Sequence, residues 1–221
     1  MPRLTYRQRH RRVTQSLEDA WKASEMPAED PGLREVYANV PRLPIRLITS
    51  PLWIDANQGG LLRAADAFRL ERLDLSPEKD GARDFSGSMG ASKWQPWRWV
   101  TTEQAIDDAI QDGLTTYALT LGADAVAIGD VEWRFPAAIV LGEEKKGVAA
   151  EIAARCDFRV AIPMFGLMGS LNVGMAAAIA LYHAAMACHA AHPEFEPVRN
   201  GSRRLLGLDD LDYLAEGDGD E

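Results

Sequence analysis

Two kinds of hydrophobic pattern alternate along most of this chain. Short continuous apolar runs, some closed by proline or glycine, predict buried strands, and segments with apolar residues at three- and four-residue spacing predict helices. The predicted strands cover residues 46–49, 72–75, 94–100, 115–121, 137–141 and 158–162. The predicted helices cover residues 57–68, 102–112 and 149–154, followed by a long Ala-rich helix up to Pro193. This alternation predicts an α/β fold with a mostly parallel sheet and helices on both faces.

The ends of the chain follow a different pattern. Residues 6–24 and 33–39 have helical spacing, and a linker rich in proline and glycine separates them. Beyond Pro193 the sequence becomes irregular and then acidic. We therefore expect a helical N-terminal extension (1–42), one α/β domain (43–192), and an irregular extension with an acidic tail (193–221).

Charge is distributed unevenly. The net charge of −9 argues against a general polyanion binder, because nucleic-acid affinity depends largely on lysine and arginine. A cluster at the N-terminus that includes Arg3, Arg7 and Arg11 could still contact phosphate, or could be a solvated arm. From Leu208 onward there are seven acidic residues and no basic residue, which is typical of a solvated tail.

Several classes of protein are disfavoured by composition. The most apolar segment, 173–191, is too rich in alanine and is interrupted by histidines, so we expect no membrane span. The N-terminus shows no secretory signal, and Cys156 and Cys188 lack metal-ligand spacing. We expect a cytoplasmic protein with two buried thiols and no metal.

Three polar loops at strand or helix ends are candidate sites. The first contains Asn57, two glycines that we expect at a loop-to-helix junction, and Arg63. Asn57 and Arg63 could converge if Asn57 lies in a loop, or Asn57 could cap the helix while Arg63 pairs with Asp66. The second, from Gly142 through Glu144 to Gly147, is by itself an ordinary strand-to-helix turn.

The third loop follows the last predicted strand. It runs from Pro163 to Asn172, and Ser170 or Asn172 is suited to cap the long helix. Open α/β sheets bind ligands at such strand ends. Met164 and Met168 are expected in the core, and Ser170 lacks the surroundings of a serine nucleophile. Trp94, Trp97 and Trp99 could stack on bases or pack in the core.

Taken together, the three loops resemble the ordered signatures of the SpoU-type ribose 2'-O-methyltransferases. Asn57 with Arg63-Ala-Ala-Asp-Ala-Phe resembles the first signature, Gly142-x-Glu144-x-x-Gly147 the second, and Ile162-Pro-Met with Ser170-Leu-Asn172-Val the third. Gly90-Ala-Ser-Lys93-Trp94 is similar to a segment before the central strand. The resemblance covers about residues 44 to 190 and is strongest to bacterial tRNA guanosine 2'-O-methyltransferases.

This resemblance implies a deep C-terminal trefoil knot, S-adenosyl-L-methionine as methyl donor, S-adenosyl-L-homocysteine as product, a homodimer, and RNA, above all tRNA, as acceptor. The residues that it implies for donor binding are Leu119, Leu121, Gly142, Ile162 and Leu171. Those that it implies for catalysis are Arg63, Asn57, Glu144, Ser170 and Asn172. With it, Lys93 joins the N-terminal arginines as a candidate RNA contact.

Alternatives from other classes remain. An rRNA 2'-O-methyltransferase of the same family, or a non-catalytic homologue that binds RNA or protein, would carry the same fold, and the negative charge favours the non-catalytic homologue. A conventional Rossmann enzyme would need a Gly-x-Gly-x-x-Gly after its first strand, which is absent. The acidic composition also departs from the basic character expected of tRNA enzymes.

Overall fold

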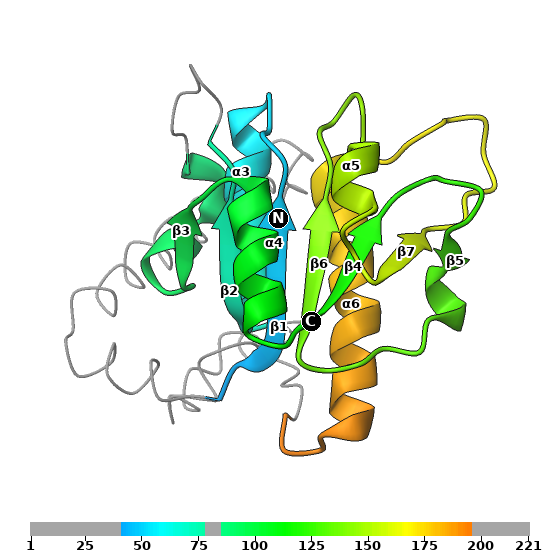
Figure 1. The fold of residues 1–221 in the computed structure, drawn as a ribbon. Helices are drawn as coiled ribbons and strands as arrows, with labels where there is room; N and C mark the ends of the chain where they lie inside the picture. Colours follow the sequence, from blue (N-terminus) through cyan, green and yellow to red (C-terminus); the bar gives the residue numbers. More distant parts are fainter. Residues whose placement is uncertain (1–40, 78–84, 196–221) are drawn as a thin grey trace, which may run out of the picture. The chain divides into compact units, whose positions relative to one another are not determined.

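Every strand that the structure describes belongs to one sheet (Figure 1), with the order β3-β2-β1-β6-β4-β7-β5. The computed structural model describes residues 41–77 and 85–195. The strands are β1 (Leu43–Thr49), β2 (Leu70–Leu75), β3 (Trp97–Trp99), β4 (Thr115–Leu119), β5 (Val126–Ala127), β6 (Ala137–Leu141) and β7 (Phe158–Ala161). Each pairing between these strands is parallel, which confirms the predicted fold class.

Helices cover both faces of the sheet, as predicted. They are α3 (Asp55–Ala67), α4 (Thr102–Gln111), α5 (Ala150–Ala153) and α6 (Val173–Ala191), with short 3-10 turns η2 (Ser86–Ser88), η3 (Ala91–Lys93) and η4 (Ile128–Asp130). Successive side chains of a strand point to opposite faces. Accordingly, Ile139 of β6 packs in the core with α3 and α6, and its neighbour Val140 packs in the core with α4 and α5. Figure 1 shows α4 in front of the sheet and α6 behind it.

The predicted elements agree with the structure best where the sequence is most apolar. Strand β6 has the predicted bounds, whereas β3 is shorter than predicted, because η3 and Pro96 come before it. The two-residue strand β5 was not predicted. The predicted N-terminal helices and acidic tail lie outside the described residues, and the domain boundaries and the knot stay predictions.

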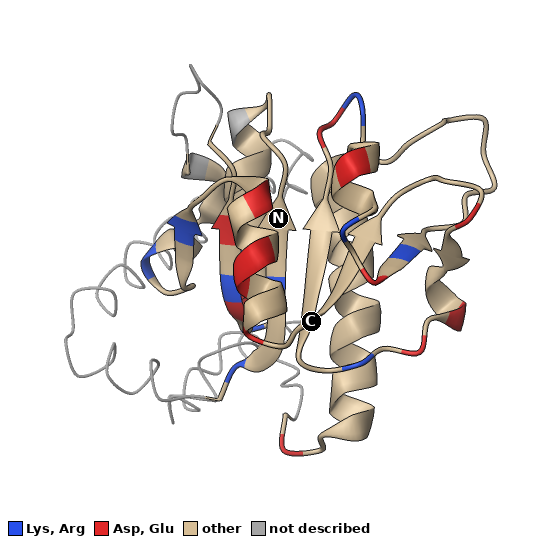
Figure 2. Cartoon of the chain, viewed as in Figure 1, with Lys and Arg blue, Asp and Glu red and all other residues tan. Residues whose placement is uncertain are grey.

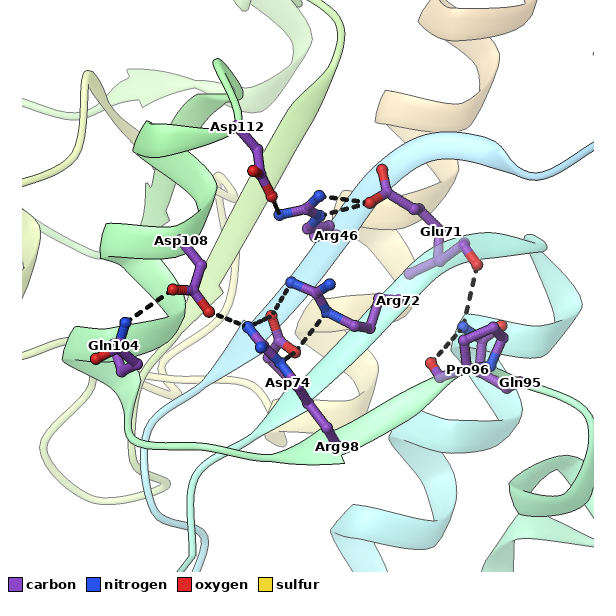
Figure 3. Close-up of polar contacts among 11 residues, drawn as sticks. Arg46, Glu71, Arg72, Asp74, Gln95, Pro96, Arg98, Gln104, Asp108 and Asp112 are labelled. Atoms are coloured by element: carbon purple, nitrogen blue, oxygen red, sulfur yellow. Dashed lines mark hydrogen bonds and ion pairs between the residues drawn. The ribbon is translucent and has the colours of Figure 1, made fainter.

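A network of ion pairs joins the sheet to α4 (Figure 3). Arg46 of β1, whose side chain is 8% exposed, contacts Glu71 of β2 and Asp112 beyond the end of α4, each at 2.6 Å. Burial lowers the pKa of Arg46, but the bonds to Asp112 and Glu71 outweigh this effect, so the net shift is upward. These contacts hold the N-terminal half of the sheet to one end of α4.

A second part of the network is centred on Asp74, whose carboxylate is fully buried. It accepts from Arg72 Nε at 2.8 Å and from Arg98 Nε at 2.7 Å, and Arg98 also reaches Asp108 of α4 at 2.5 Å. Asp74 is on β2 and Arg98 on β3, so these bonds fasten the three-residue edge strand to its neighbour. The buried negative charge of Asp74 is tolerated because two guanidinium groups pair with it.

Close backbone contact explains a glycine in the middle of α3. A Cβ at Gly59 would lie 2.8 Å from Ser88 N and 2.9 Å from Gly87 Cα, which is closer than real Cβ atoms approach. The prediction that the two glycines lie at a loop-to-helix junction is therefore wrong. Gly59 is inside the helix, and its lack of a side chain lets η2 pack directly on the α3 backbone.

Helix α6 contains no lysine, arginine, aspartate or glutamate (Figure 2), whereas α4 carries three acidic residues. By length and composition alone α6 could cross a membrane. One side of it packs in the core through residues such as Ala177, Leu181 and Cys188, which is typical of a buried helix in a globular fold.

Candidate functional site

The loops that follow β4, β6 and β7 meet at the carboxyl ends of these strands and enclose a cavity of about 400 Å³. Residues 119–122, 141–148 and 169–171, together with Ile162, Met164 and the start of α6, form its walls. This volume is within the range of small-molecule sites, and the position matches the ligand sites of open α/β sheets. The five residues expected to bind the methyl donor (Leu119, Leu121, Gly142, Ile162 and Leu171) all line this cavity.

The loop after β6 is a tight turn that needs glycine at its first position. The backbones of Glu143 and Gly147 exchange two hydrogen bonds, at 3.0 and 2.9 Å, and Gly147 has a positive φ of 69°. A Cβ on Gly142 would lie 1.8 Å from the carbonyl carbon of Gly147. The turn therefore closes only because Gly142 has no side chain.

Asn172 begins α6 as its N-cap. Its Oδ1 accepts from the backbone N–H groups of Gly174 at 2.9 Å and Met175 at 3.3 Å, which satisfies two otherwise unpaired amides. Ser170, the other candidate for the cap, does not serve that purpose. Ser170 is exposed and lines the cavity.

Helix α3, the turn after β6 and the start of α6 are connected by side chains as well as by proximity. Asn57 Nδ2 donates to Glu144 Oε1 at 2.8 Å, and Asn172 Nδ2 donates to Asn57 Oδ1 at 3.1 Å. Asn57 thus links the turn after β6 to the start of α6. Glu144 and Asn172, which are 87 and 115 positions from Asn57, are fixed with it in one chain of hydrogen bonds.

Glu144 is held by more donors than the sequence indicated. Besides Asn57, the backbone N–H groups of Trp53 (3.1 Å) and Ile54 (3.2 Å) donate to its carboxylate. Burial raises the pKa of Glu144, but these hydrogen bonds outweigh it and the net shift is downward. Glu144 is therefore a charged positioning group and a poor proton acceptor near neutral pH.

Neither of the two arrangements considered for Asn57 and Arg63 is observed. Asn57 does not lie in a loop and does not cap the helix, because α3 begins at Asp55 with Ile54 as N-cap, and Asn57 occupies its third position. Six helical residues correspond to about two thirds of a turn beyond one full turn, so the two side chains leave α3 in different directions. Asn57 is buried against Glu144, whereas Arg63 is exposed.

Arg63 has no hydrogen-bond or ion-pair partner within residues 41–77 and 85–195, and the ion pair with Asp66 that the spacing allowed is not formed. Lys93, in η3, is likewise exposed and makes no ion pair with a described residue. Both cations are accessible to a ligand. Arg3, Arg7 and Arg11 lie outside the described residues.

Two expectations about apolar residues had different outcomes. Trp97 and Trp99 pack against the core and against Phe85, with the Phe85 and Trp97 ring centroids 4.9 Å apart, so they are core residues. Met168 is 78% exposed, and the prediction that it packs in the core is wrong. Its loop extends beyond the sheet, and Phe165 and Leu167 are fully exposed beside it.

The described residues contain no group of three His, Cys, Asp or Glu side chains that could hold a metal ion. Burial raises the pKa of both Cys156 and Cys188 to about 11, so neither thiol is a ready nucleophile at neutral pH.

Sequence reasoning missed Trp53, Ile54 and Lys145. Trp53 and Ile54 contact Glu144 through their backbone N–H groups, which every residue except proline carries, so no side-chain pattern could reveal them. The ammonium group of Lys145 lies 4.7 Å from the centroid of the Trp53 ring. This contact joins two loops that are 92 positions apart, and no local motif indicates it.

Comparison with known proteins gives a consistent result. The profile of the SpoU rRNA Methylase family matches residues 44–182. The tRNA (guanosine(18)-2'-O)-methyltransferase of Thermus thermophilus is 32% identical over 132 residues, which are 58% of this chain and 67% of that protein. The enzyme of the same name from Escherichia coli is 31% identical, and the match spans 58% of this chain but only 57% of that protein.

Solved structures resemble the fold. A structure described as an A. aeolicus TrmH/SpoU tRNA modifying enzyme has a TM-score of 0.66 at 24% identity and covers 87% of this chain and 93% of that one. An RNA 2'-O ribose methyltransferase has a TM-score of 0.59 at 29% identity and covers 66% of this chain and 58% of that one. The family profile spans the sheet, the cavity and the hydrogen-bonded residues Asn57, Glu144 and Asn172. This chain therefore belongs to the SpoU rRNA methylase family.

Proposed function

We propose that this protein transfers the methyl group of S-adenosyl-L-methionine to a ribose 2'-hydroxyl of RNA, with a guanosine in tRNA as the first candidate acceptor. The observation that carries the proposal is the hydrogen-bonded set Asn57, Glu144 and Asn172 beside a 400 Å³ cavity. The names of the relatives from Thermus thermophilus and Escherichia coli support the choice of acceptor.

The cavity suits the methyl donor. Its walls include backbone around Gly142, Ile162 and Leu171, which can bond the edge of an adenine, and apolar side chains such as Leu119 and Val173. The tight turn after Gly142 brings main-chain groups to the wall of the cavity without an intervening side chain. The proposal assigns donor binding to these residues and to Leu121.

The reaction needs positioning and removal of one proton. The ribose oxygen attacks the sulfonium methyl in line, an O–C bond forms as the C–S bond breaks, and S-adenosyl-L-homocysteine leaves. Glu144 is a poor base for the released proton because its pKa is lowered, and a guanidinium stays protonated, so Arg63 does not accept it either. We assign proton removal to a phosphate oxygen of the RNA or to water.

Arg63 then acts on the acceptor. Its exposed guanidinium can grip a phosphate bidentately and orient the adjoining ribose. Ser170 lines the cavity and is free to contact the ribose, while Asn57, Glu144 and Asn172 hold the loops in place. Lys93 is a candidate contact to the RNA backbone because it is exposed and forms no ion pair with a described residue.

The proposal includes a homodimer. Helix α6 exposes Met175, Tyr182 and Met186 on a helix without charged residues, and the loop before it exposes Phe165 and Leu167. Exposed apolar groups of this size mark interaction surfaces. A second copy of the chain would cover them in a symmetric contact. The proposal also includes a cytoplasmic location.

The test is methyl transfer from tritium-labelled S-adenosyl-L-methionine to unmodified tRNA and, in parallel, to ribosomal RNA. We expect label in tRNA at a nucleotide whose 3' phosphodiester resists alkaline hydrolysis, since a 2'-O-methyl group blocks that cleavage. Label in ribosomal RNA alone would assign the other acceptor. Donor binding without transfer to either RNA would favour the non-catalytic homologue, which the net charge of −9 makes the second candidate.

A further inference from the structure

Trp53 is a large aromatic residue that the fold leaves in solvent. It lies in the short connection between β1 and α3, and 56% of its surface is exposed. Tryptophan usually buries most of its ring, because that area contributes strongly to folding. Of the five tryptophans in the described residues, Trp53 is the one classed as exposed, whereas Trp97 and Trp99 pack against the core.

The exposed ring is nevertheless fixed in position. The backbone N–H of Trp53 donates to Glu144 Oε2 at 3.1 Å, and the Lys145 ammonium lies 4.7 Å from the ring centroid. Glu144 and Lys145 both line the cavity. The ring therefore lies at the rim of the proposed donor site, held by one contact to its backbone and one to its π system.

A fixed and exposed indole at this rim suits a nucleobase. The acceptor ribose must bring its 2'-oxygen to within about 3.5 Å of the methyl carbon, so the attached base must lie close to the mouth of the cavity. Bases taken out of a helical stack are commonly received on aromatic side chains, because every base offers a flat π face. Lys145 adds positive charge beside the ring, where an RNA backbone would pass.

We propose that the Trp53 ring stacks on the base of the nucleotide that is methylated, or on its immediate neighbour, and so positions the acceptor at the cavity. This inference rests on the proposed function. Trp53 is then a positioning residue for RNA, with no contact to the methyl group. Loss of the ring should weaken acceptor binding and leave donor binding unchanged.

The test uses the full chain as wild type, Trp53→Phe, Trp53→Leu and Trp53→Ala, with an unmodified tRNA transcript as the RNA. All three variants keep the backbone N–H that bonds Glu144. Phenylalanine keeps a π face, and leucine keeps apolar bulk without one. We expect Trp53→Leu and Trp53→Ala to raise KM for the RNA about tenfold or more, with Trp53→Phe within about threefold of wild type. The Kd for S-adenosyl-L-methionine, measured by calorimetry, should stay within about twofold in all three.

Three results would overturn the inference. Equal KM values for Trp53→Leu and Trp53→Phe would show that stacking is not involved. Loss of donor binding in all variants would place the ring in the donor site, and a changed oligomeric state on gel filtration would place it in a subunit interface. If the wild type transfers no methyl group, the proposed function fails, while equilibrium binding of the same RNA to Trp53→Phe and Trp53→Leu still decides whether the ring stacks.

Discussion

Replacing Glu144 with glutamine tests whether the hydrogen bonds of this carboxylate hold the proposed donor site in its binding conformation. The two oxygens of Glu144 accept three hydrogen bonds, from Asn57 Nδ2 and Ile54 N–H at Oε1 and from Trp53 N–H at Oε2. Glutamine has the same shape but one oxygen and one amide NH2 group. In either orientation at least one N–H donor loses its acceptor and faces another donor.

The size of the effect follows from these three bonds. A hydrogen bond to a charged group contributes about 1.5–3 kcal/mol, and a neutral one about 0.5–1.5 kcal/mol. Glu144→Gln removes one charged bond and weakens two others, but water replaces part of the loss because Glu144 is only half-buried. We expect the conformation of residues 142–148 seen in the structure to become less stable by about 2 kcal/mol. Because the donor would bind this conformation, its affinity should fall roughly 30-fold.

Calorimetric titration of the donor into wild type, Glu144→Gln and Glu151→Gln separates hydrogen bonding from charge. Glu151→Gln removes the same charge from an exposed position on the neighbouring helix α5 that does not line the cavity, and we expect a loss below about threefold. Thermal unfolding would confirm that all three proteins are folded. A Glu144→Gln protein that binds the donor within twofold of wild type would refute the role given to this carboxylate.

The same carboxylate predicts a pH dependence. Because hydrogen bonds lower the pKa of Glu144 below its ordinary value of 4.5, the bonds are present in full above that value and are lost as pH falls through the lower folded-state pKa. Protonation of Glu144 should therefore leave the donor affinity of the wild type unchanged down to about pH 4.5 and lower it below that value. The Glu144→Gln protein should lack this component of the fall.

Three further substitutions test separate parts of the structure. Arg63→Ala should lower methyl transfer about a hundredfold or more and leave donor binding and stability unchanged, because the side chain is exposed; normal turnover would exclude its role. Gly142→Ala should abolish donor binding, since its Cβ would lie 1.8 Å from a backbone carbon, whereas Gly129→Ala, which has open space around it and does not line the cavity, should bind normally; equal behaviour of the two would contradict the turn geometry. Asp74→Asn should lower the free energy of unfolding, measured in urea, by about 2–3 kcal/mol, because Arg72 and Arg98 lose their shared buried carboxylate. An unchanged urea midpoint would show that the network adds nothing to stability.

The sequence predicted the sheet well because its strands are buried on both faces. Continuous apolar runs such as Ala137–Leu141 have little alternative to the interior of a parallel sheet. Strand β5 was not predicted, because two residues are too few to show a periodic pattern. At the start of α4, the Thr101 hydroxyl accepts from Gln104 N–H and caps the helix, whereas the Thr102 hydroxyl donates to the carbonyl of Thr49 in β1. Which of two adjacent threonines caps the helix thus depends on a tertiary contact.

The signatures implied which three residues of the candidate site lie together, but not how they are arranged. Asn57, Glu144 and Asn172 were expected from ordered signatures, and the structure brings them together. The entry into α3 was not predictable, because no side chain caps that helix. The backbone N–H groups of Trp53 and Ile54, just before the helix, instead bond a carboxylate about 90 positions further along the chain. Local spacing therefore did not indicate that the helix begins two residues before Asn57.

The contact at Gly59 has a consequence for how this fold can diverge. Helix α3 carries Asn57 toward the interior and Arg63 toward solvent, so its rotation about its own axis sets both directions at once. At Gly59 main chain meets main chain, and no rotamer is present that could adjust to a neighbouring mutation. The orientation of helix α3 is therefore set by contact between backbones. Acceptor preference can then change through the side chains around the helix, without a change in its orientation.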